Sequence, residues 1–251
     1  MVVARLRAAG CVFAEDEARL LLSAAGTPDE LAAMVGRRVE GVPLEHVLGW
    51  VEFCGRRIAV DEAVFVPRRR TELLVREAVA HARPGAVVVD LCCGCGALGA
   101  TVAAAVGPVE LHAADIEPAA VRCAERNVAP FGGRVYEGDL YEPLPTALHQ
   151  RVDVLIANAP YVPSDAVATL PPEARIHEPL VALDGGADGL DVLRRVIAEA
   201  PTWLAPGGLL LVESGTAQAP QLLAAVERAG LAGRLVTSDE PEATVVLAFA
   251  N

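Results

Sequence analysis

Apolar residues follow different spacings before and after residue 84. Before it they recur every three or four positions, as in Thr71–His81, which predicts amphipathic helices. Beyond it, continuous apolar runs alternate with helical segments, as expected for buried parallel strands joined by helices. The expected strands are Ala86–Leu91, Val109–Ala114, Arg134–Glu137, Val152–Ala157 and Leu209–Ser214, and the expected helices are Ala97–Ala105, Pro118–Val128, Asp191–Ala200 and Pro220–Ala229. This order predicts an α/β fold with a doubly wound, mostly parallel sheet.

Two hairpins and a helical start complete the predicted architecture. Leu235–Ser238 and Thr244–Phe249 flank a turn and predict a closing antiparallel pair, which makes the sheet seven-stranded. The first 36 residues predict short helices. One of them begins after Thr27, which is followed by Pro28 at the first helical position and by Glu30 at the capping-box position. Val51–Cys54 and Arg57–Val60 predict a hairpin in a linker. We therefore expect a helical domain at 1–40, a linker at 41–70 and the α/β domain at 71–251.

The composition narrows the class of protein. Of the 251 residues, 53% are hydrophobic, which is enough for a folded core and excludes a disordered chain. No apolar run reaches the roughly 18–20 residues of a membrane span, and Met1–Gly10 lacks the pattern of a secretion signal. We expect a cytoplasmic protein without membrane contact.

The cysteines fit a reducing compartment. Three of the six, Cys92, Cys93 and Cys95, lie within four residues, which is poor geometry for separate disulfides. Their spacing is not Cys-x2-Cys, and no second pair or histidine cluster accompanies them, so no metal site is expected. Small residues filling a tight loop are the better interpretation.

The charge argues against a protein that coats nucleic acid. The formal net charge is −12, and every basic residue is an arginine. Residues 1–80 hold 11 arginines against 12 acids, so the acidity belongs to the remainder of the chain. Direct binding of nucleic acid through bulk charge is therefore not expected.

A glycine-rich loop follows the first strand of the predicted α/β domain. Gly94-x-Gly96-x-x-Gly99 matches the fingerprint of dinucleotide-binding loops, so a nicotinamide-dependent dehydrogenase is one hypothesis. Asp90 favours another, because an acid before the loop suits the cationic amino acid part of S-adenosylmethionine better than a pyrophosphate. Asp-x-x-x-Gly-x-Gly also resembles the first motif of class I methyltransferases.

Acids at the ends of the next two strands suit a nucleoside. Asp115 can accept hydrogen bonds from both ribose hydroxyls, or it can cap the helix Pro118–Val128. Asp139 can take the adenine amino group while Leu140 packs on the ring, or it can be an ordinary turn residue.

The most specific chemistry lies at the end of the fourth strand, in Asn158-Ala159-Pro160-Tyr161. An amide or aromatic amine nitrogen is a poor nucleophile because its lone pair is delocalised. The Asn158 side-chain oxygen and a neighbouring backbone carbonyl can accept hydrogen bonds from both N–H groups and so aim the lone pair at a methyl group. Pro160 biases Ala159 toward an extended conformation, and Tyr161 can stack on a flat target group. These residues are the candidate catalytic and substrate-binding group.

Asn158-Ala159-Pro160-Tyr161 resembles the Asn-Pro-Pro-Tyr motif of amino-methyltransferases that modify adenine or glutamine nitrogens. Further segments resemble the glutamine branch, the peptide-chain release factor N5-glutamine methyltransferase family (HemK/PrmC type). They are Gly41–Leu44, Gly49–Phe53, Val66–Glu72, Glu178–Leu183 and Gly185–Leu190. The similarity runs from about residue 40 to the end of the chain.

The resemblance implies a Rossmann-like class I methyltransferase fold, S-adenosylmethionine as cofactor and S-adenosylhomocysteine as product. It implies cofactor contacts from Cys92, Cys93, Gly94, Cys95, Gly96, Asp115, Leu140 and Asn158. It also implies that Asn158, Ala159, Pro160 and Tyr161 hold a glutamine side chain. In the family that glutamine lies in a Gly-Gly-Gln loop of a release factor, and the N-terminal helical domain recognises the protein substrate.

Three departures from the family pattern suggest a divergent paralogue. Ala159 replaces the first proline of the reacting motif, Arg69 replaces the second proline of the linker motif, and His177 stands where an aromatic is usual. A backbone carbonyl survives the change to alanine, but the chain becomes less rigid. Alternative acceptors are a small molecule or adenine in nucleic acid, and a non-catalytic cofactor-binding protein is a further hypothesis.

Overall fold

A computed structural model describes residues 1–251 and contains a seven-stranded sheet. The strand order is β5-β4-β3-β6-β7-β9-β8. The strands are β3 (Val87–Leu91), β4 (Glu110–Asp115), β5 (Arg134–Glu137), β6 (Val152–Ala157), β7 (Leu204–Glu213), β8 (Ala232–Asp239) and β9 (Glu242–Phe249). The first five are parallel, and β9 pairs antiparallel with both β7 and β8. The predicted doubly wound sheet with its closing hairpin is confirmed.

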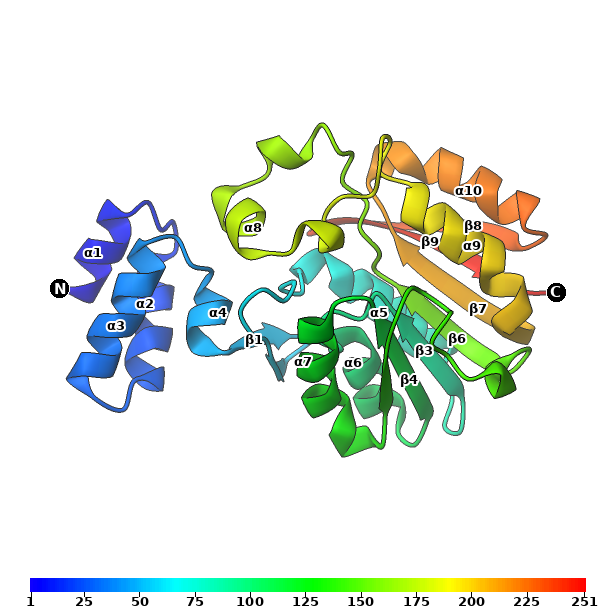
Figure 1. The fold of residues 1–251 in the computed structure, drawn as a ribbon, viewed down its shortest axis with the longest axis horizontal. Coiled ribbons are helices and arrows are strands. Elements are labelled where there is room, and N and C mark those ends of the chain that lie inside the picture. The colour runs from blue at the N-terminus through cyan, green and yellow to red at the C-terminus, as the bar shows by residue number, and fades with distance from the viewer.

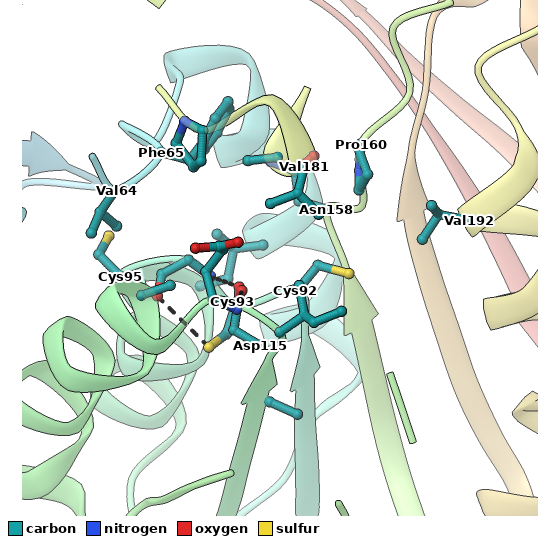
Figure 2. Close-up of a pocket in the computed structure, with 18 of the residues that line it drawn as sticks. Val64, Phe65, Cys92, Cys93, Cys95, Asp115, Asn158, Pro160, Val181 and Val192 are labelled. Atoms are coloured by element: carbon teal, nitrogen blue, oxygen red, sulfur yellow. Dashed lines mark hydrogen bonds between the residues drawn. The ribbon is translucent and has the colours of Figure 1, made fainter. Parts of the chain in front are cut away.

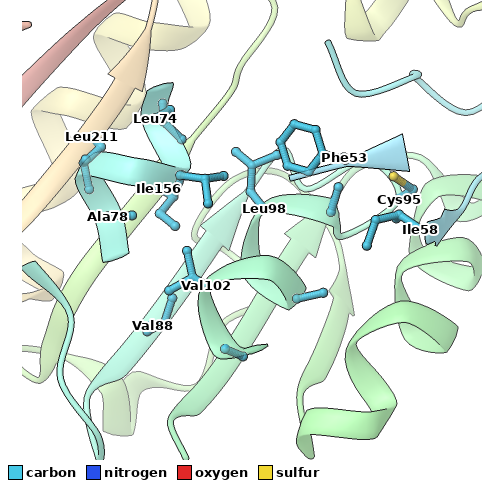
Figure 3. Packing of buried hydrophobic residues seen from close by; sticks show 14 of the residues in the cluster. Phe53, Ile58, Leu74, Ala78, Val88, Cys95, Leu98, Val102, Ile156 and Leu211 are labelled. Carbon is cyan, nitrogen blue, oxygen red and sulfur yellow. The ribbon is translucent and has the colours of Figure 1, made fainter. Parts of the chain in front are cut away.

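Helices cover both faces of this sheet (Figure 1). One face packs against α5 (Glu72–His81), α6 (Ala97–Val106) and α7 (Pro118–Val128), and the other against α9 (Asp191–Trp203) and α10 (Ala219–Arg228). The strand β3 shows how the apolar run is used: Val88 joins the first core, whereas Val87 and Val89 join the second. Successive side chains point to opposite faces, so a strand buried on both sides must be apolar throughout. Figure 3 shows Val88 and Ile156 of the sheet close to Leu98 and Val102 of α6 in the first core.

The N-terminal helices form a small core of their own. They are α1 (Val2–Ala8), α2 (Ala14–Ala24), α3 (Pro28–Val39) and α4 (Leu44–Leu48). Leu6, Leu21 and Val35 are buried among them. The expected cap at Thr27 is present, because its Oγ1 accepts the Glu30 N–H at 3.2 Å. The Glu30 carboxylate reaches the Gly26 N–H at 2.8 Å instead of the Thr27 N–H, so the box closes one residue earlier.

The linker hairpin is fixed to the α/β domain. The predicted hairpin is present, with each strand one residue earlier than expected: β1 (Trp50–Phe53) pairs with β2 (Arg56–Ala59), and Phe53 is buried in the first core. Asn127 of α7 accepts the Ala59 N–H at 3.0 Å and donates to the Ala59 carbonyl at 2.8 Å. The same Asn127 amide donates to the Cys95 carbonyl at 2.8 Å, so one side chain ties the hairpin to the glycine-rich loop.

Two short helices and a strand boundary differ from the sequence prediction. The helix α4 follows Pro43, and α8 (Pro172–His177) lies inside the Pro-rich stretch 160–189. Both are too short to show a helical period, and Pro172 at the first position of α8 begins a helix because its missing N–H is not needed there. The strand β7 begins at Leu204, five residues before the expected Leu209, with an irregular register beside β6. The first five residues of β7, Leu204–Gly208, include a proline and two glycines, so no apolar run predicts a strand there.

Candidate functional site

Two adjoining cavities lie at the carboxyl ends of the central strands, where doubly wound sheets bind ligands. The first lies between the glycine-rich loop, the end of β4 and the linker residues 63–67, and spans about 1060 Å³ including the solvent at its mouth (Figure 2). The second lies between Arg68, Arg70, the end of β6 and α8, and spans about 800 Å³ on the same measure. Four residues line both cavities: Phe65, Asn158, Pro160 and Ala182. Asn158 therefore stands in a wall that faces two ligand spaces.

The glycine-rich loop lines the first cavity in a conformation that side chains disfavour. Gly94 has φ +54° and Gly96 has φ +75°, in the left-handed region. A Cβ at position 96 would lie 3.1 Å from the Ala124 Cβ, so α7 packs directly on the loop. Cys92, Cys93, Gly94 and Cys95 line the cavity, as the sequence interpretation requires of a cofactor loop, whereas Gly96 supplies the turn.

Asp115 fixes this loop from the end of β4. One carboxylate oxygen accepts the Gly94 N–H at 2.8 Å, and the other accepts the Glu117 N–H at 3.0 Å. Burial raises the pKa of the Asp115 carboxyl. The N-cap of α7 is Glu117, so Asp115 is not the helix cap that the sequence offered as an alternative. It lines the first cavity with lone pairs still available to a ligand.

Asp139 and Leu140 line the same cavity from the turn after β5. An Asp139 carboxylate oxygen accepts a hydrogen bond from the Arg195 guanidinium at 2.6 Å. Arg195 comes from α9 and also lines the cavity, but sequence reasoning missed it. An arginine on an amphipathic helix gives no local signal that it lines a cavity, and its partner Asp139 lies 56 residues earlier in the sequence.

Asp90 lies beneath the loop and is not part of either cavity wall. Its side chain is fully buried, and one carboxylate oxygen accepts the Gly99 N–H at 2.8 Å while the other has no partner. Burial raises the pKa of this carboxyl to about 8. The sequence interpretation placed Asp90 beside the cofactor. In the structure its side chain lies beneath the loop and contacts the Gly99 N–H near the start of α6, so a cofactor contact from Asp90 stays a prediction.

The reacting tetrapeptide follows β6 and borders both cavities. The Asn158 side chain faces both cavities and makes no hydrogen bond within the protein, and neither does the Ala159 carbonyl oxygen, so both acceptors are available. Ala159 and Pro160 are buried and line the second cavity. The Tyr161 hydroxyl donates to Glu213 at 2.8 Å and accepts from Arg70 at 2.9 Å, and burial raises its pKa. Glu213, at the end of β7, is a further residue that sequence reasoning missed.

An ion pair closes the linker against the Pro-rich stretch. Arg68 donates to both oxygens of Glu178, at 2.7 and 2.6 Å, and Glu178 also accepts the Val66 N–H at 3.1 Å. The Glu178 side chain is only 1% exposed. This contact fixes the linker segment 65–68, in which Phe65 lines both cavities.

All six cysteines are free, and no group of three or more His, Cys, Asp or Glu side chains is arranged to hold a metal ion. No helix is long and apolar enough to cross a membrane.

Comparison with known proteins identifies relatives that share most of the chain. Residues 64–183 match the family described as "Methyltransferase small domain". The release factor glutamine methyltransferase of Geobacter sulfurreducens is 39% identical over 217 residues, which cover 84% of this chain and 75% of the relative. The ribosomal protein uL3 glutamine methyltransferase of Burkholderia pseudomallei is 39% identical over 214 residues, which cover 79% of this chain and 69% of the relative.

Solved structures agree on the fold. A methyltransferase from Pyrococcus furiosus superposes with a TM-score of 0.58 at 15% identity, covering 78% of this chain and 89% of that one. The Rossmann-like methyltransferase architecture is therefore shared even where the sequences have diverged.

Proposed function

The chain belongs to the family of release factor glutamine methyltransferases, and on this premise we propose that it transfers a methyl group from S-adenosylmethionine to the side-chain amide nitrogen of a protein glutamine. The observation that supports this most directly is the position of Asn158 in the wall shared by the two cavities. A methyl donor in the first cavity and an amide in the second would meet at this side chain.

The first cavity suits S-adenosylmethionine by shape and chemistry. Its walls are mainly apolar, with Ile116, Leu140 and Val192 available to a flat adenine ring. Carboxylates of Asp115 and Asp139 are available to ribose hydroxyls, to the adenine amino group and to positive charge. The tight backbone at Gly94 and Gly96 allows close approach of the amino acid part. When bound, the sulfonium supplies an electrophilic methyl group.

In the second cavity, Asn158 and Ala159 orient the nucleophile. The Asn158 Oδ1 and the Ala159 carbonyl oxygen accept the two N–H groups of the glutamine amide, which turns the nitrogen lone pair toward the methyl. The bound cofactor would give its methyl group to this nitrogen and would keep the electron pair of the broken S–C bond, leaving S-adenosylhomocysteine. The extra proton leaves to water, so no general base is needed. Pro160 and Tyr161 shape the wall of this cavity, and positioning supplies most of the rate.

The substrate we propose is a Gly-Gly-Gln loop of a peptide-chain release factor. An exposed loop can present its glutamine through the mouth of the second cavity beside α8, and the helical residues 1–40 stand next to this mouth to contact the rest of the protein. These helices contact the cavity wall directly, because Arg38 donates to Glu173 of α8 at 2.6 Å, and Glu173 lines the second cavity. The specificity of the enzyme would then depend on both parts of the chain.

The test uses purified protein, methyl-labelled S-adenosylmethionine and a release factor with an intact Gly-Gly-Gln loop. We expect the target glutamine to gain one methyl group by mass spectrometry, and the same release factor with Gln replaced by Ala in that loop to gain none. Parallel reactions with a small aromatic amine and with adenine-containing DNA report the alternative acceptors.

Asn158→Ala tests the site. It removes an acceptor needed only at the reacting nitrogen, so turnover should fall by about 100-fold or more, while calorimetric affinity for the cofactor stays within about threefold. Asn251→Ala, at the exposed end of the chain, is the matched control. Unchanged turnover in Asn158→Ala would contradict the assignment.

A further inference from the structure

Alanine at position 159 leaves the reacting segment with one proline where the family motif has two, yet the segment is closely held. Ala159 is 1% exposed, and the residues that follow it are hydrogen-bonded to Gln218, Leu183 and Gly185. The most specific of these contacts comes from Gln218, in the short 3-10 helix Thr216–Gln218 that follows β7. Neither the proposed mechanism nor the sequence motifs use this residue.

The Gln218 side-chain amide joins three loops. Its Nε2 donates to the Tyr161 carbonyl at 2.9 Å and to the Asp188 carbonyl at 3.0 Å. Its Oε1 accepts the Gly215 N–H at 2.9 Å. Every hydrogen-bonding direction but one acceptor lone pair is therefore used, and all the partners are backbone groups. A backbone partner is insensitive to side-chain identity, so this arrangement fixes the path of the chain.

The loop on the far side of Tyr161 packs too closely for any side chain. A Cβ at Gly185 would lie 2.6 Å from the Pro160 carbonyl oxygen, and a Cβ at Gly189 would lie 2.3 Å from the Tyr161 carbonyl oxygen and 2.5 Å from Gln218 Nε2. The backbone N–H of Gly185 also donates to Val162 at 2.9 Å. The two carbonyls that follow Ala159 are thus confined between the glycine loop and the Gln218 amide.

We propose that Gln218 is a positioning residue for methyl transfer: by holding the Tyr161 backbone against the loop Gly185–Gly189, it supplies the rigidity that alanine at position 159 does not. This inference rests on the proposed function, since it concerns the acceptor carbonyl of Ala159. If the Ala159 carbonyl oxygen is displaced, it no longer lines up with the N–H of the substrate amide. Small displacements of groups that position a substrate lower the reaction rate strongly. Gln218 touches neither ligand itself.

Restoring the family proline at position 159 offers a rescue experiment. The Ala159 N–H makes no hydrogen bond within the protein, so proline there removes none. Proline restricts the backbone through its ring, independently of Gln218. Loss of the Gln218 amide and gain of proline should therefore offset one another if, and only if, both act on the same backbone freedom.

The experiment compares wild type, Gln218→Leu, Ala159→Pro and the double variant, with Gln221→Leu as control. Gln221 lies nearby on α10 but is exposed and does not contact the reacting segment. We expect Gln218→Leu to lower kcat about tenfold with KM for both substrates within about twofold, because three hydrogen bonds to the backbone are lost away from the two cavities. In the Ala159→Pro background, the same Gln218→Leu change should lower kcat by less than about twofold, so the double variant is compared with Ala159→Pro alone.

A second measurement is independent of any substrate. Amide hydrogen exchange of the peptide that spans Ala159–Val162 should accelerate in Gln218→Leu, return toward wild type in the double variant and stay unchanged in Gln221→Leu. Unchanged exchange in Gln218→Leu, or a loss of turnover that Ala159→Pro does not rescue, would overturn the proposal. If wild type methylates no glutamine, the proposed function fails, and the exchange data alone then decide whether Gln218 fixes this segment.

Discussion

Asp90 offers a test of how burial, rather than catalysis, determines the behaviour of an acid beside a cofactor loop. Its carboxylate has one partner, the Gly99 N–H, and no cation nearby to compensate for full burial. Burial raises its pKa from the ordinary 3.8 to about 8. In the unfolded chain the same group titrates in water.

The sign of the effect follows from proton binding. Between the unfolded and folded pKa values, the folded protein holds a proton that the unfolded chain has released, so the free energy of unfolding falls as the pH rises. The expected slope is about 1.4 kcal/mol per pH unit from this group alone. Asp90→Asn removes the titration and keeps an oxygen for the Gly99 N–H. Relative to wild type, the variant should therefore gain about 3 kcal/mol between about pH 5 and about pH 7.

Urea unfolding at several pH values, extrapolated linearly to water, measures this difference. Asp165→Asn, at an exposed position, is the matched control and should show no such gain. An unpaired amide in Asp90→Asn would shift its stability by a constant amount, which leaves the slope unaffected. A difference between Asp90→Asn and wild type that does not change with pH would refute the reasoning and imply that the folded protein keeps this carboxylate ionised.

Two ion pairs that join distant segments give further predictions. Glu178→Ala removes the buried partner of Arg68, which can turn to solvent; we expect a loss of about 1–2 kcal/mol in unfolding free energy and a higher KM for the protein substrate, measured by denaturation and steady-state kinetics. Arg38 also donates to both carboxylate oxygens of the buried Glu17, at 2.7 and 3.2 Å. Arg38→Met leaves this carboxylate buried without its partner and removes the contact with Glu173, so the unfolding free energy of the N-terminal helices should fall by about 3 kcal/mol. Limited proteolysis should then cleave these helices first, and a cleavage pattern like that of wild type would contradict this.

Local sequence patterns predicted the helices and strands in which the spacing of apolar residues shows which side chains are buried. The helix Pro118–Val128 and the strands Arg134–Glu137 and Val152–Ala157 have the bounds that their apolar spacing indicated. Proline and a capping threonine marked the start of α3, because those residues act on the backbone beside them. The short helices α4 and α8 were missed because one or two turns do not establish a period.

Some features of the candidate site could also be predicted from the sequence, and others could not. The glycine-rich loop, Asp115 and Asn158 could be recognised from the sequence, because their chemistry depends on a few neighbouring residues at the end of a strand. Which cavity each residue faces could not, as the buried position of Asp90 illustrates.

The sequence by itself determined the class of fold, the candidate cofactor loop and the motif proposed to meet the acceptor nitrogen. Only the tertiary structure placed Asn158 between two cavities, brought Arg195 into the wall of the first, and set Gln218 and Glu213 against Tyr161 beside the second. Each of these three residues acts on a partner more than 50 positions away. Such a contact depends on how the sheet twists and on which strands lie side by side, and the spacing of residues along one segment carries no information about either.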